Sequence, residues 1–257
     1  MSEVVEIRVH AMNRADDLWY RGQYAVSQAV NEREEFRIVG GHMVRLLLHV
    51  YPTAQVVPRS TLDADAAIGN VEVVGPVVHS LMKQKFTKEK GNLFSRTLEG
   101  GERVEINLLL PRSGPAPGVR SQAVPGVGEV DTLPELSFAM NQSPLVLDVT
   151  AELIGGRTIR YRTMIPDPET AVILKAHSWN NRRAAKDLAD LHSLLEIRQE
   201  HPKTSWSLND PQRGFRRAAA RILQKLGEQL PRQRTGFELP ASLDRMRLAG
   251  LIAKHVR

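Results

Sequence analysis

The sequence changes character at Pro166 and Pro168, and this break constrains the fold more than any other feature of the chain. Before the break, segments in which apolar and polar residues alternate, as in strands, stand between helix-like segments. After it, apolar residues recur at helical spacing almost to the end of the chain. The sequence therefore predicts an α+β fold with two domains. A mixed sheet flanked by helices occupies residues 1–166, and a helical C-terminal domain occupies residues 167–257.

The segments before the break supply the strands and helices of the sheet domain. Helices are expected over residues 14–31 and 73–85, and a third in HMVRLLLHVY, which follows two glycines. Strands are expected in FRIVGG, TLDADAAI, NLFSRTL, RVEINLLL, PLVLDVTAEL and RTIRYRTMI. The segment from Pro111 to Pro134 holds five prolines and four glycines, and it is expected to form a long mobile loop.

The helical part is also the basic part of the chain. Its expected helices are PETAVILKAHSWNNRR, AAKDLADLHSLLEIRQE, DPQRGFRRAAARILQKLGEQL and SLDRMRLAGLIAKHV. From Lys175 onward there are 17 Lys or Arg against 8 Asp or Glu, a net charge of +9, whereas residues 1–174 have a net charge of −3. This asymmetry indicates a polyanionic partner such as RNA, and a solvated basic surface is the alternative.

The composition excludes several classes of protein and site. The chain has no cysteine, so disulfides and thiolate zinc sites are excluded, and its eight histidines are scattered. The first residues lack the apolar core of a signal peptide, and no apolar run approaches the roughly 18 residues of a membrane span. We therefore expect a soluble cytoplasmic protein without a membrane partner.

Two aspartates stand close together in RSTLDADAAI, which otherwise has the pattern of a short strand. Aspartate is depleted in strands, and residues two apart on a strand face the same side, so Asp63 and Asp65 would repel each other without a cation between them. The pair indicates either a solvated turn or a divalent metal site. Mg²⁺ prefers one or two carboxylates together with phosphate oxygens, and with Ser60 and Thr61 just ahead the pair suits a nucleoside triphosphate.

Two features of the sheet domain are compatible with phosphate chemistry, although each also has a purely structural interpretation. Gly40 and Gly41 end a strand and open a helix, where backbone amides favour phosphate, but such a pair is commonly only a turn. Glu105 and Asn107 face the side of their strand opposite Val104. Glu105 is a candidate third metal ligand, a candidate general base or an exposed glutamate on a half-buried sheet.

A further feature lies in the helical part, in ILKAHSWNNRRAAKDLADLHSLL. A lysine ammonium is a point charge suited to a triphosphate, and Lys175 is the candidate. Asp187 and Asp190 are three apart on one helix face, and Lys186 reaches Asp190 at a spacing of four residues. The alternative for each of these residues is an ordinary solvated helix face.

In their order along the chain, these motifs resemble the nucleotidyltransferase superfamily with the DNA polymerase beta-like fold. Within it, the chain is similar to the AbiEii/AbiGii toxin family, which includes MenT-like toxins, over roughly residues 36 to 195. That family has a Gly-Gly or Gly-Ser turn, an Arg-x-Thr-x-Asp-x-Asp stretch, and a lysine before a Lys-Asp-x-x-Asp helix. The matching residues are Gly40, Gly41, Arg59, Thr61, Asp63, Asp65, Lys175, Lys186, Asp187 and Asp190. The chain departs at His42, where many members carry serine, and at Glu105, where aspartate is commoner.

The resemblance implies a toxin-type nucleotidyltransferase that uses Mg²⁺ to transfer a nucleoside monophosphate from an NTP to the tRNA 3′ end. It also implies a cognate antitoxin. In this scheme Asp63, Asp65 and Glu105 are metal ligands, with Glu105 as the alternative base. Lys175 offsets phosphate charge, and Asp187 orients Lys175 or contacts the acceptor. The residues expected to bind the nucleotide are Gly40, Gly41, Arg59, Ser60, Thr61 and Lys186.

The basic segment RGFRRAAARILQK fits an RNA phosphate backbone, with charges spread over more than one side of its helix. Its cationic residues are Arg213, Arg216, Arg217, Arg221 and Lys225. Two other functions remain open. One is transfer of a nucleotide to a small molecule or a protein hydroxyl, and the other is a non-catalytic nucleotide- or RNA-binding module. The basic tail favours RNA over a small acceptor, and the intact carboxylate set favours an enzyme.

Overall fold

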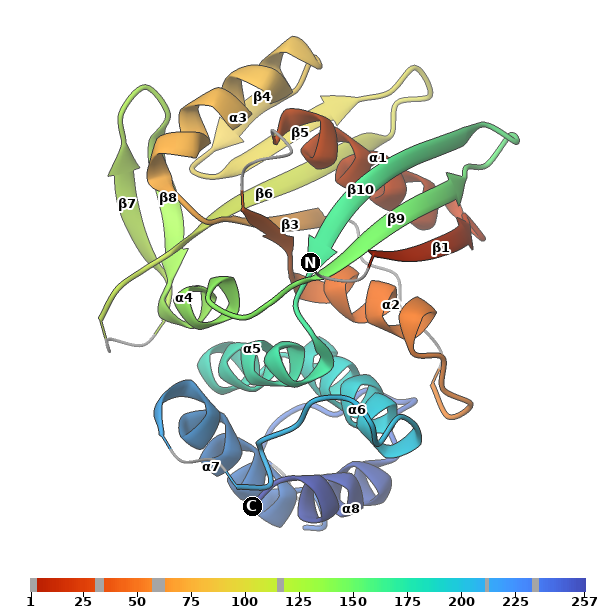
Figure 1. Ribbon diagram of the computed structural model, residues 1–257, viewed down its shortest axis with the longest axis vertical. Coiled ribbons are helices and arrows are strands. Elements are labelled where there is room, and N and C mark those ends of the chain that lie inside the picture. The colour runs from red at the N-terminus through yellow and green to blue at the C-terminus, as the bar shows by residue number, and fades with distance from the viewer. Residues whose placement is uncertain (1–3, 31–34, 57–62, 115–117, 211–212, 233–235) are drawn as a thin grey trace. The chain divides into compact units, whose positions relative to one another are not determined.

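The computed structural model describes residues 4–30, 35–56, 63–114, 118–210, 213–232 and 236–257, and for Asp63 it describes the backbone alone. The chain divides into two compact units, whose elements are labelled in Figure 1. Unit 1 comprises residues 1–43 and 59–166, and unit 2 comprises residues 44–58 and 167–257. Helix α2 (Gly40–Val50) therefore begins in unit 1 and ends in unit 2.

The larger sheet of unit 1 carries the candidate carboxylates. Its described strands are β2 (Phe36–Ile38), β3 (Asp63–Ile68), β4 (Thr87–Lys90), β5 (Leu93–Thr97), β6 (Arg103–Pro111), β7 (Arg120–Val124) and β8 (Gly128–Leu133). They run in the order β2-β3-β6-β5-β4, and β8 pairs with the last residues of β6 on one side and with β7 on the other. Strand β3 is parallel to β6 and antiparallel to β2, so the two strands that carry the acidic residues are direct neighbours.

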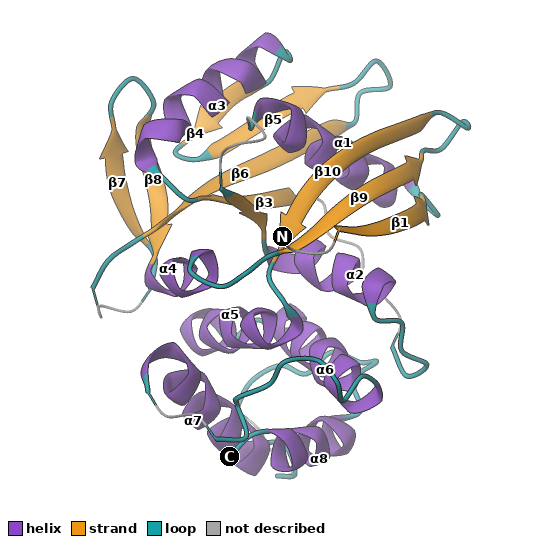
Figure 2. Ribbon diagram, in the orientation of Figure 1, coloured by secondary structure: helices purple, strands orange, loops and turns teal. Residues whose placement is uncertain are grey.

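A smaller sheet completes unit 1, and Figure 2 shows the strands of both sheets in orange. Its described strands are β1 (Val4–His10), β9 (Leu145–Glu152) and β10 (Thr158–Ile165), in the order β1-β9-β10. Helix α1 (Arg14–Ala29) contacts β3 and β6 of the larger sheet as well as β10 of the smaller one. Because Trp19, Tyr20 and Val26 on α1 are buried, this helix supplies core residues to both sheets.

Two shorter helices of unit 1 follow strands of the larger sheet. Helix α3 (Val71–Lys83) begins where the Asn70 side chain accepts a hydrogen bond from the backbone amide of Glu72, as an N-cap residue does. Helix α4 (Pro134–Met140) begins with proline at a position where the missing amide costs no intrahelical hydrogen bond.

Unit 2 is helical. Its described helices are α5 (Pro168–Arg182), α6 (Ala185–Glu200), α7 (Gly214–Gln229) and α8 (Arg245–His255), together with the later part of α2. The break in the sequence pattern is the start of α5, where the Asp167 side chain accepts a hydrogen bond of 2.7 Å from the amide of Thr170 and Pro168 opens the helix. The expected helix in AAKDLADLHSLLEIRQE is present as α6, and its leucines Leu188, Leu191 and Leu195 are fully buried on one side.

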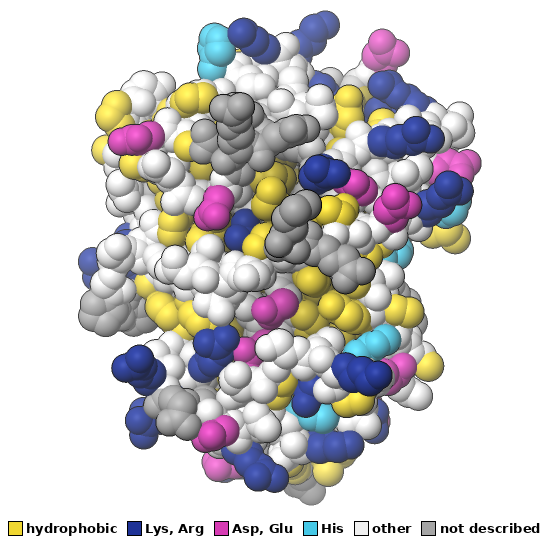
Figure 3. Space-filling model, in the orientation of Figure 1, with side chains coloured by type: hydrophobic (Ala, Val, Ile, Leu, Met, Phe, Trp, Pro, Cys, Tyr) yellow, Lys and Arg dark blue, Asp and Glu magenta, His cyan; other side chains and the backbone are white. Residues whose placement is uncertain are grey.

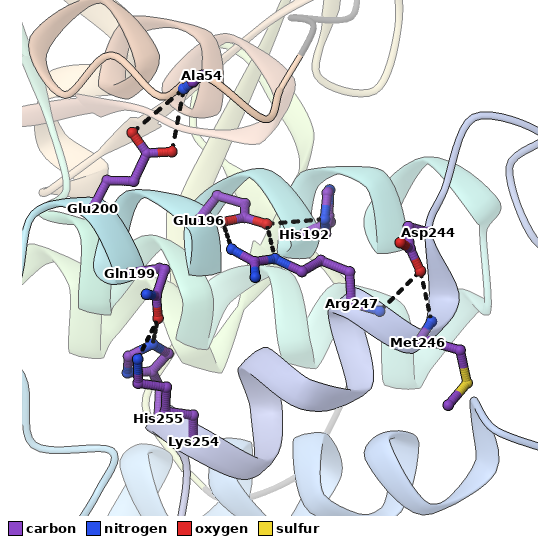
Figure 4. A network of polar contacts seen from close by, with 10 residues as sticks. All are labelled: Ala54, His192, Glu196, Gln199, Glu200, Asp244, Met246, Arg247, Lys254 and His255. Atoms are coloured by element: carbon purple, nitrogen blue, oxygen red, sulfur yellow. Dashed lines mark hydrogen bonds and ion pairs between the residues drawn. The ribbon is translucent and has the colours of Figure 1, made fainter.

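A buried carboxylate joins α6 to α8, as Figure 4 shows. Glu196 accepts two hydrogen bonds from Arg247, from Nε to Oε1 at 2.7 Å and from Nη2 to Oε2 at 2.8 Å, and His192 Nε2 lies 3.4 Å from Oε1. Glu200, one turn further along α6, accepts from the backbone amide of Ala54. Glu196 is fully buried whereas the Arg247 side chain is 45% exposed, so this two-bond pair ties α8 to α6 at the protein surface.

The predicted α+β fold class is confirmed: mixed sheets are flanked by helices and followed by a helical C-terminal part. The predicted long loop between Pro111 and Pro134 is wrong, because β7 and β8 form a hairpin within it. Pro125 lies in the hairpin turn rather than in a strand, and positive φ values occur at Gly126 in the turn (73°) and at Gly128, the first residue of β8 (96°). Among the described helices, none has the length and apolar character that crossing a membrane requires.

Candidate functional site

The Gly-Gly turn lies directly beside the aspartate strand. Strand β2 pairs with β3 in a register that sets Ile38 opposite Ala66, and the amide of Val39 then donates a hydrogen bond of 2.9 Å to the carbonyl of Asp65. The chain turns into α2 at Gly40, whose φ is +70°. A left-handed φ is costly for any residue with a Cβ, so glycine permits this turn.

Glycine at position 40 also makes room for Asp65. A Cβ built on Gly40 would collide with Asp65 Oδ2. The Asp65 carboxylate therefore lies against the start of α2, where Gly41 continues the first turn. A helix N-terminus presents unpaired amides and a partial positive charge that favour anions. The turn and the carboxylate thus form one local structure, in which phosphate oxygens would find both amides and a carboxylate-held cation.

The parallel pairing of β3 with β6 aligns the acidic positions. Residue 63 pairs with Glu105, and Asp65 pairs with Asn107. Along β6, Val104, Ile106 and Leu108 are buried, whereas Glu105 and Asn107 are half-buried on the opposite face, as predicted. The backbone therefore places the three candidate carboxylate positions on two neighbouring strands, with residues 63 and 105 side by side.

Two side chains orient the described carboxylates. Asn107 Nδ2 donates a hydrogen bond of 3.2 Å to Asp65 Oδ1. The Glu105 carboxylate lies 3.8 Å from Arg103 Nε, and the same guanidinium pairs with Glu89 at 2.9 Å. An amide donor fixes a carboxylate without adding charge, whereas an arginine lowers the net negative charge near it. Asp65 thus has a defined orientation, and Glu105 has a cation beside it.

The donor set at this place fits Mg²⁺. Asp63, Asp65 and Glu105 would supply the carboxylate oxygens that Mg²⁺ prefers, and it usually keeps water and phosphate oxygens as its other ligands. Among the side chains that the structure describes, which leave out that of Asp63, no three acidic or histidine groups are clustered as metal ligands. The metal role of these residues therefore remains a prediction that depends on Asp63.

The predicted lysine–aspartate cluster forms within unit 2. Lys175 Nζ lies 2.6 Å from Asp190 Oδ2 and 3.6 Å from Asp187 Oδ1, and the lysine side chain is only 3% exposed. Asp187 also accepts two hydrogen bonds from Arg182, at 2.7 and 2.6 Å. Two cations and two carboxylates thus balance each other, which accounts for the burial of charged groups that are otherwise rarely enclosed.

The other predicted residues fall into three groups. Lys186 is exposed on the first turn of α6. Arg59, Ser60 and Thr61 lie outside the described residues. His42 is fully buried, with its ring 4.8 Å from that of Trp19 in an edge-on arrangement, so this side chain faces the core.

Asn107 and Arg103 are the residues of this site that the sequence motifs did not assign a role. Both alternate with Glu105 on β6, so the strand pattern already put them on its face. The pattern alone does not say which of them reaches a carboxylate, because that depends on the parallel register of β3 and β6.

Comparison with known proteins finds a likeness in structure but none in sequence. No family model matches the chain, and no curated protein is similar to it in sequence. An antigenic nucleotidyltransferase-like protein from Paracoccidioides brasiliensis, known from a crystal structure, is similar in structure with a TM-score of 0.45 and 16% identity, over 88% of this chain and 95% of that one. Similarity at this level carries no information about activity.

Proposed function

We propose that this protein is a toxin-type nucleotidyltransferase, which uses Mg²⁺ to transfer a nucleoside monophosphate from an NTP to the 3′ end of tRNA. The observation that supports it most is the position of Asp65, between the Gly40 turn and the Asn107 amide, on the strand next to Glu105. A carboxylate at a helix N-terminus sets a candidate cation ligand beside backbone amides, and triphosphates bind to both kinds of group.

Phosphoryl-type transfer depends mainly on positioning and on neutralisation of charge. When bound, Mg²⁺ would supply this neutralisation at the phosphate oxygens. Asp63 and Asp65 would hold it, and the amides that open α2 at Gly40 and Gly41 would bind phosphate oxygens. Glu105 would act as a third ligand or accept the proton of the attacking hydroxyl, whose oxygen forms the new bond to the α-phosphorus while pyrophosphate leaves.

Four further residues would bind the same triphosphate. They are Arg59, Ser60, Thr61 and Lys186, which we include because of their places in the sequence motifs. Arg103 would limit the repulsion between Glu105 and its acidic neighbours, because its guanidinium lies 3.8 Å from that carboxylate.

The proposal gives Lys175 the task of offsetting charge on the departing pyrophosphate, and it gives Asp187 the task of orienting Lys175. The distance of 3.6 Å between Lys175 Nζ and Asp187 Oδ1 supports the second part. Because the ammonium also pairs with Asp190 at 2.6 Å, a phosphate oxygen has to compete with that carboxylate. The catalytic task of Lys175 therefore requires a rearrangement of this pair.

The proposal also includes an RNA acceptor and a protein partner, the antitoxin. The net charge of +9 from Lys175 onward supports a polyanionic acceptor over a small molecule. A cognate antitoxin that restrains the activity follows from the resemblance to toxin families alone.

The test combines the purified protein with Mg²⁺, each labelled nucleoside triphosphate in turn, and total tRNA. We expect label to move onto tRNA, and we expect Asp65→Asn to lower the rate at least about 100-fold, because it removes a metal ligand but keeps the shape of the side chain. Gln122→Glu, an exposed substitution on β7, is a control that should retain the wild-type rate. Label that moves only onto protein or a small molecule would identify a different acceptor. Tight tRNA binding without any transfer would instead indicate a non-catalytic module.

A further inference from the structure

Helix α7 carries a row of cations on its exposed side. Arg213 is the N-cap residue, and Arg217, Arg221 and Lys225 follow at intervals of four residues; all four are exposed. Residues four apart lie on successive turns of a helix, with a rise of about 6 Å from one to the next. These four residues, called the α7 row below, therefore form a continuous strip that winds slowly along the helix. On the face seen in Figure 3, Lys and Arg side chains lie where α7 is, together with some Asp and Glu side chains.

The structure separates this row from the fifth basic residue of the segment. Arg216 is turned toward buried Glu169, with Nε 2.9 Å from Oε2, so it stabilises the packing of α7. Within the described residues, none of the four row residues forms an ion pair or side-chain hydrogen bond. Like charges four apart destabilise a helix, so the row is unfavourable for the isolated protein.

The fold does not depend on the row, because α7 packs through its other side. Ala219, Ala220, Leu223 and Leu226 are fully buried there. A helix that needed cations only for solubility could intersperse them with carboxylates and gain from the pairs. A regularly spaced row of four cations with one carboxylate, Glu228, near its C-terminal end is the arrangement expected where an external anion supplies most of the opposite charge.

The surface chemistry favours a phosphate backbone over the other polyanions. A helix that lies on a membrane inserts its apolar face, but the apolar face of α7 is already buried in unit 2. A protein interface is centred on large apolar or aromatic side chains, and none of the large hydrophobic side chains that are exposed in the described residues lies on α7. Phosphates at regular intervals along a nucleic-acid strand match a row of guanidinium groups, each of which can bind one phosphate through two hydrogen bonds.

We infer that the α7 row is the surface on which the sugar-phosphate backbone of the acceptor RNA docks. The inference rests on the proposed function, since it states where that acceptor is held. Contacts of this kind fix the position of a nucleic acid but do not read its sequence. The row therefore contributes affinity and salt dependence, and the choice among RNA sequences comes from elsewhere in the protein.

The test measures binding of fluorescently labelled total tRNA in the absence of NTP, so that no transfer takes place. We expect Arg217→Gln/Arg221→Gln to bind at least about 10-fold more weakly than the wild type, and the slope of log affinity against log salt to fall by about 2, which is about 1 for each lost cation. The matched control is Arg8→Gln/Arg160→Gln, which removes two exposed arginines from the smaller sheet of unit 1. The control should retain the wild-type slope. An equal loss in both double variants would overturn the inference.

A second variant separates the loss of RNA binding from a loss of folding. Arg221→Glu places a glutamate four residues before Lys225, an arrangement that stabilises helices. We expect it to weaken tRNA binding more than Arg221→Gln does, without lowering the melting temperature. If Arg221→Glu binds tRNA as the wild type does, the α7 row is not the docking surface.

The outcome for the surface is distinguishable from the outcome for the proposed function. If the wild type transfers nucleotide to tRNA while the row variants keep wild-type tRNA affinity, the surface is wrong and the function stands. If the row variants lose tRNA affinity while the wild type shows no transfer, the surface is supported and the function is wrong. The row variants could also bind phosphatidylserine vesicles more weakly than the wild type while they bind tRNA with wild-type affinity. This result would identify a membrane surface and overturn the inference.

Discussion

The amide of Asn107 donates a hydrogen bond of 3.2 Å to the carboxylate of Asp65, from the neighbouring parallel strand. The donor engages Oδ1, and Oδ2 lies against Gly40. An amide at this position holds the carboxylate in one orientation and does not compete with a metal by charge. Asn107 is therefore a positioning residue for the proposed Mg²⁺ site.

Replacement of Asn107 by alanine should weaken divalent metal binding while the fold is retained. Because the partners that orient metal ligands typically contribute 10- to 100-fold in metal affinity, we expect a loss of about 10-fold or more for Asn107→Ala. Calorimetric titration of the free protein with Mg²⁺ or Mn²⁺ measures the effect. Gln122→Ala, which removes an exposed amide from β7, is the matched control. Equal metal affinity in Asn107→Ala and wild type would exclude the positioning role.

Gly40→Ala should destabilise the protein and distort the site at once. The added Cβ meets the Asp65 carboxylate, and a left-handed φ of +70° costs a residue with a Cβ about 1–2 kcal/mol. Gly250→Ala is the contrasting substitution, because Gly250 lies within α8 with open space around its Cβ position. We expect it to stabilise by up to about 1 kcal/mol. Urea denaturation of both variants measures the two changes in the free energy of unfolding. An unchanged value for Gly40→Ala would show that the turn tolerates a side chain.

The sequence predicted the helices and strands in which apolar residues recur with a clear period. The alternation in RVEINLLL predicted which residues of β6 are buried, and the position of Pro168 predicted the start of α5. It did not recover β7 and β8, because proline and glycine in a turn change the local composition without preventing the flanking residues from pairing. The parallel pairing of residues 63 and 105 is a long-range relation, which no local pattern encodes.

The sequence likewise predicted only part of the candidate site. The spacing of the two aspartates pointed to Asp65, and the family resemblance pointed to the Lys175–Asp187 contact. The burial of Lys175 and its shorter contact with Asp190 depend on how α5 packs on α6, and helix periodicity does not specify that packing. The buried position of His42 beside Trp19 likewise depends on tertiary packing.

The Lys175–Asp190 pair should behave as a buried ion pair in a double-mutant cycle. Lys175→Met removes the ammonium next to the buried Asp190 and should cost about 3–5 kcal/mol of stability. In Lys175→Met/Asp190→Leu both charges are gone, so much of this loss should be recovered, and the coupling energy measures the interaction. Urea denaturation of the four proteins gives the cycle, and additive effects would contradict a direct pair.

The same double variant tests the proposed catalytic task of Lys175. If the ammonium offsets charge on the triphosphate, the double variant should transfer nucleotide at least about 10-fold more slowly than wild type, even though its stability is largely recovered. The reason is that a positive charge near the phosphates is missing. Wild-type transfer by this variant would leave Lys175 with a structural role alone.

His192 should make the stability of the protein fall in mild acid. Burial lowers the pKa of His192 below its ordinary value of 6.5; Glu196 and Asp244 oppose this shift and Arg247 adds to it. Above pH 6.5 the imidazole is neutral in both the folded and the unfolded chain, so it contributes no pH dependence. Below pH 6.5 the unfolded chain binds a proton that the folded chain does not, and the free energy of unfolding falls until the pH passes the lowered pKa of the folded state. We expect urea denaturation between pH 7 and pH 5 to show a shallower fall for His192→Gln than for wild type. Identical slopes in the two proteins would show that His192 gains its proton as readily in the folded state as in the unfolded one.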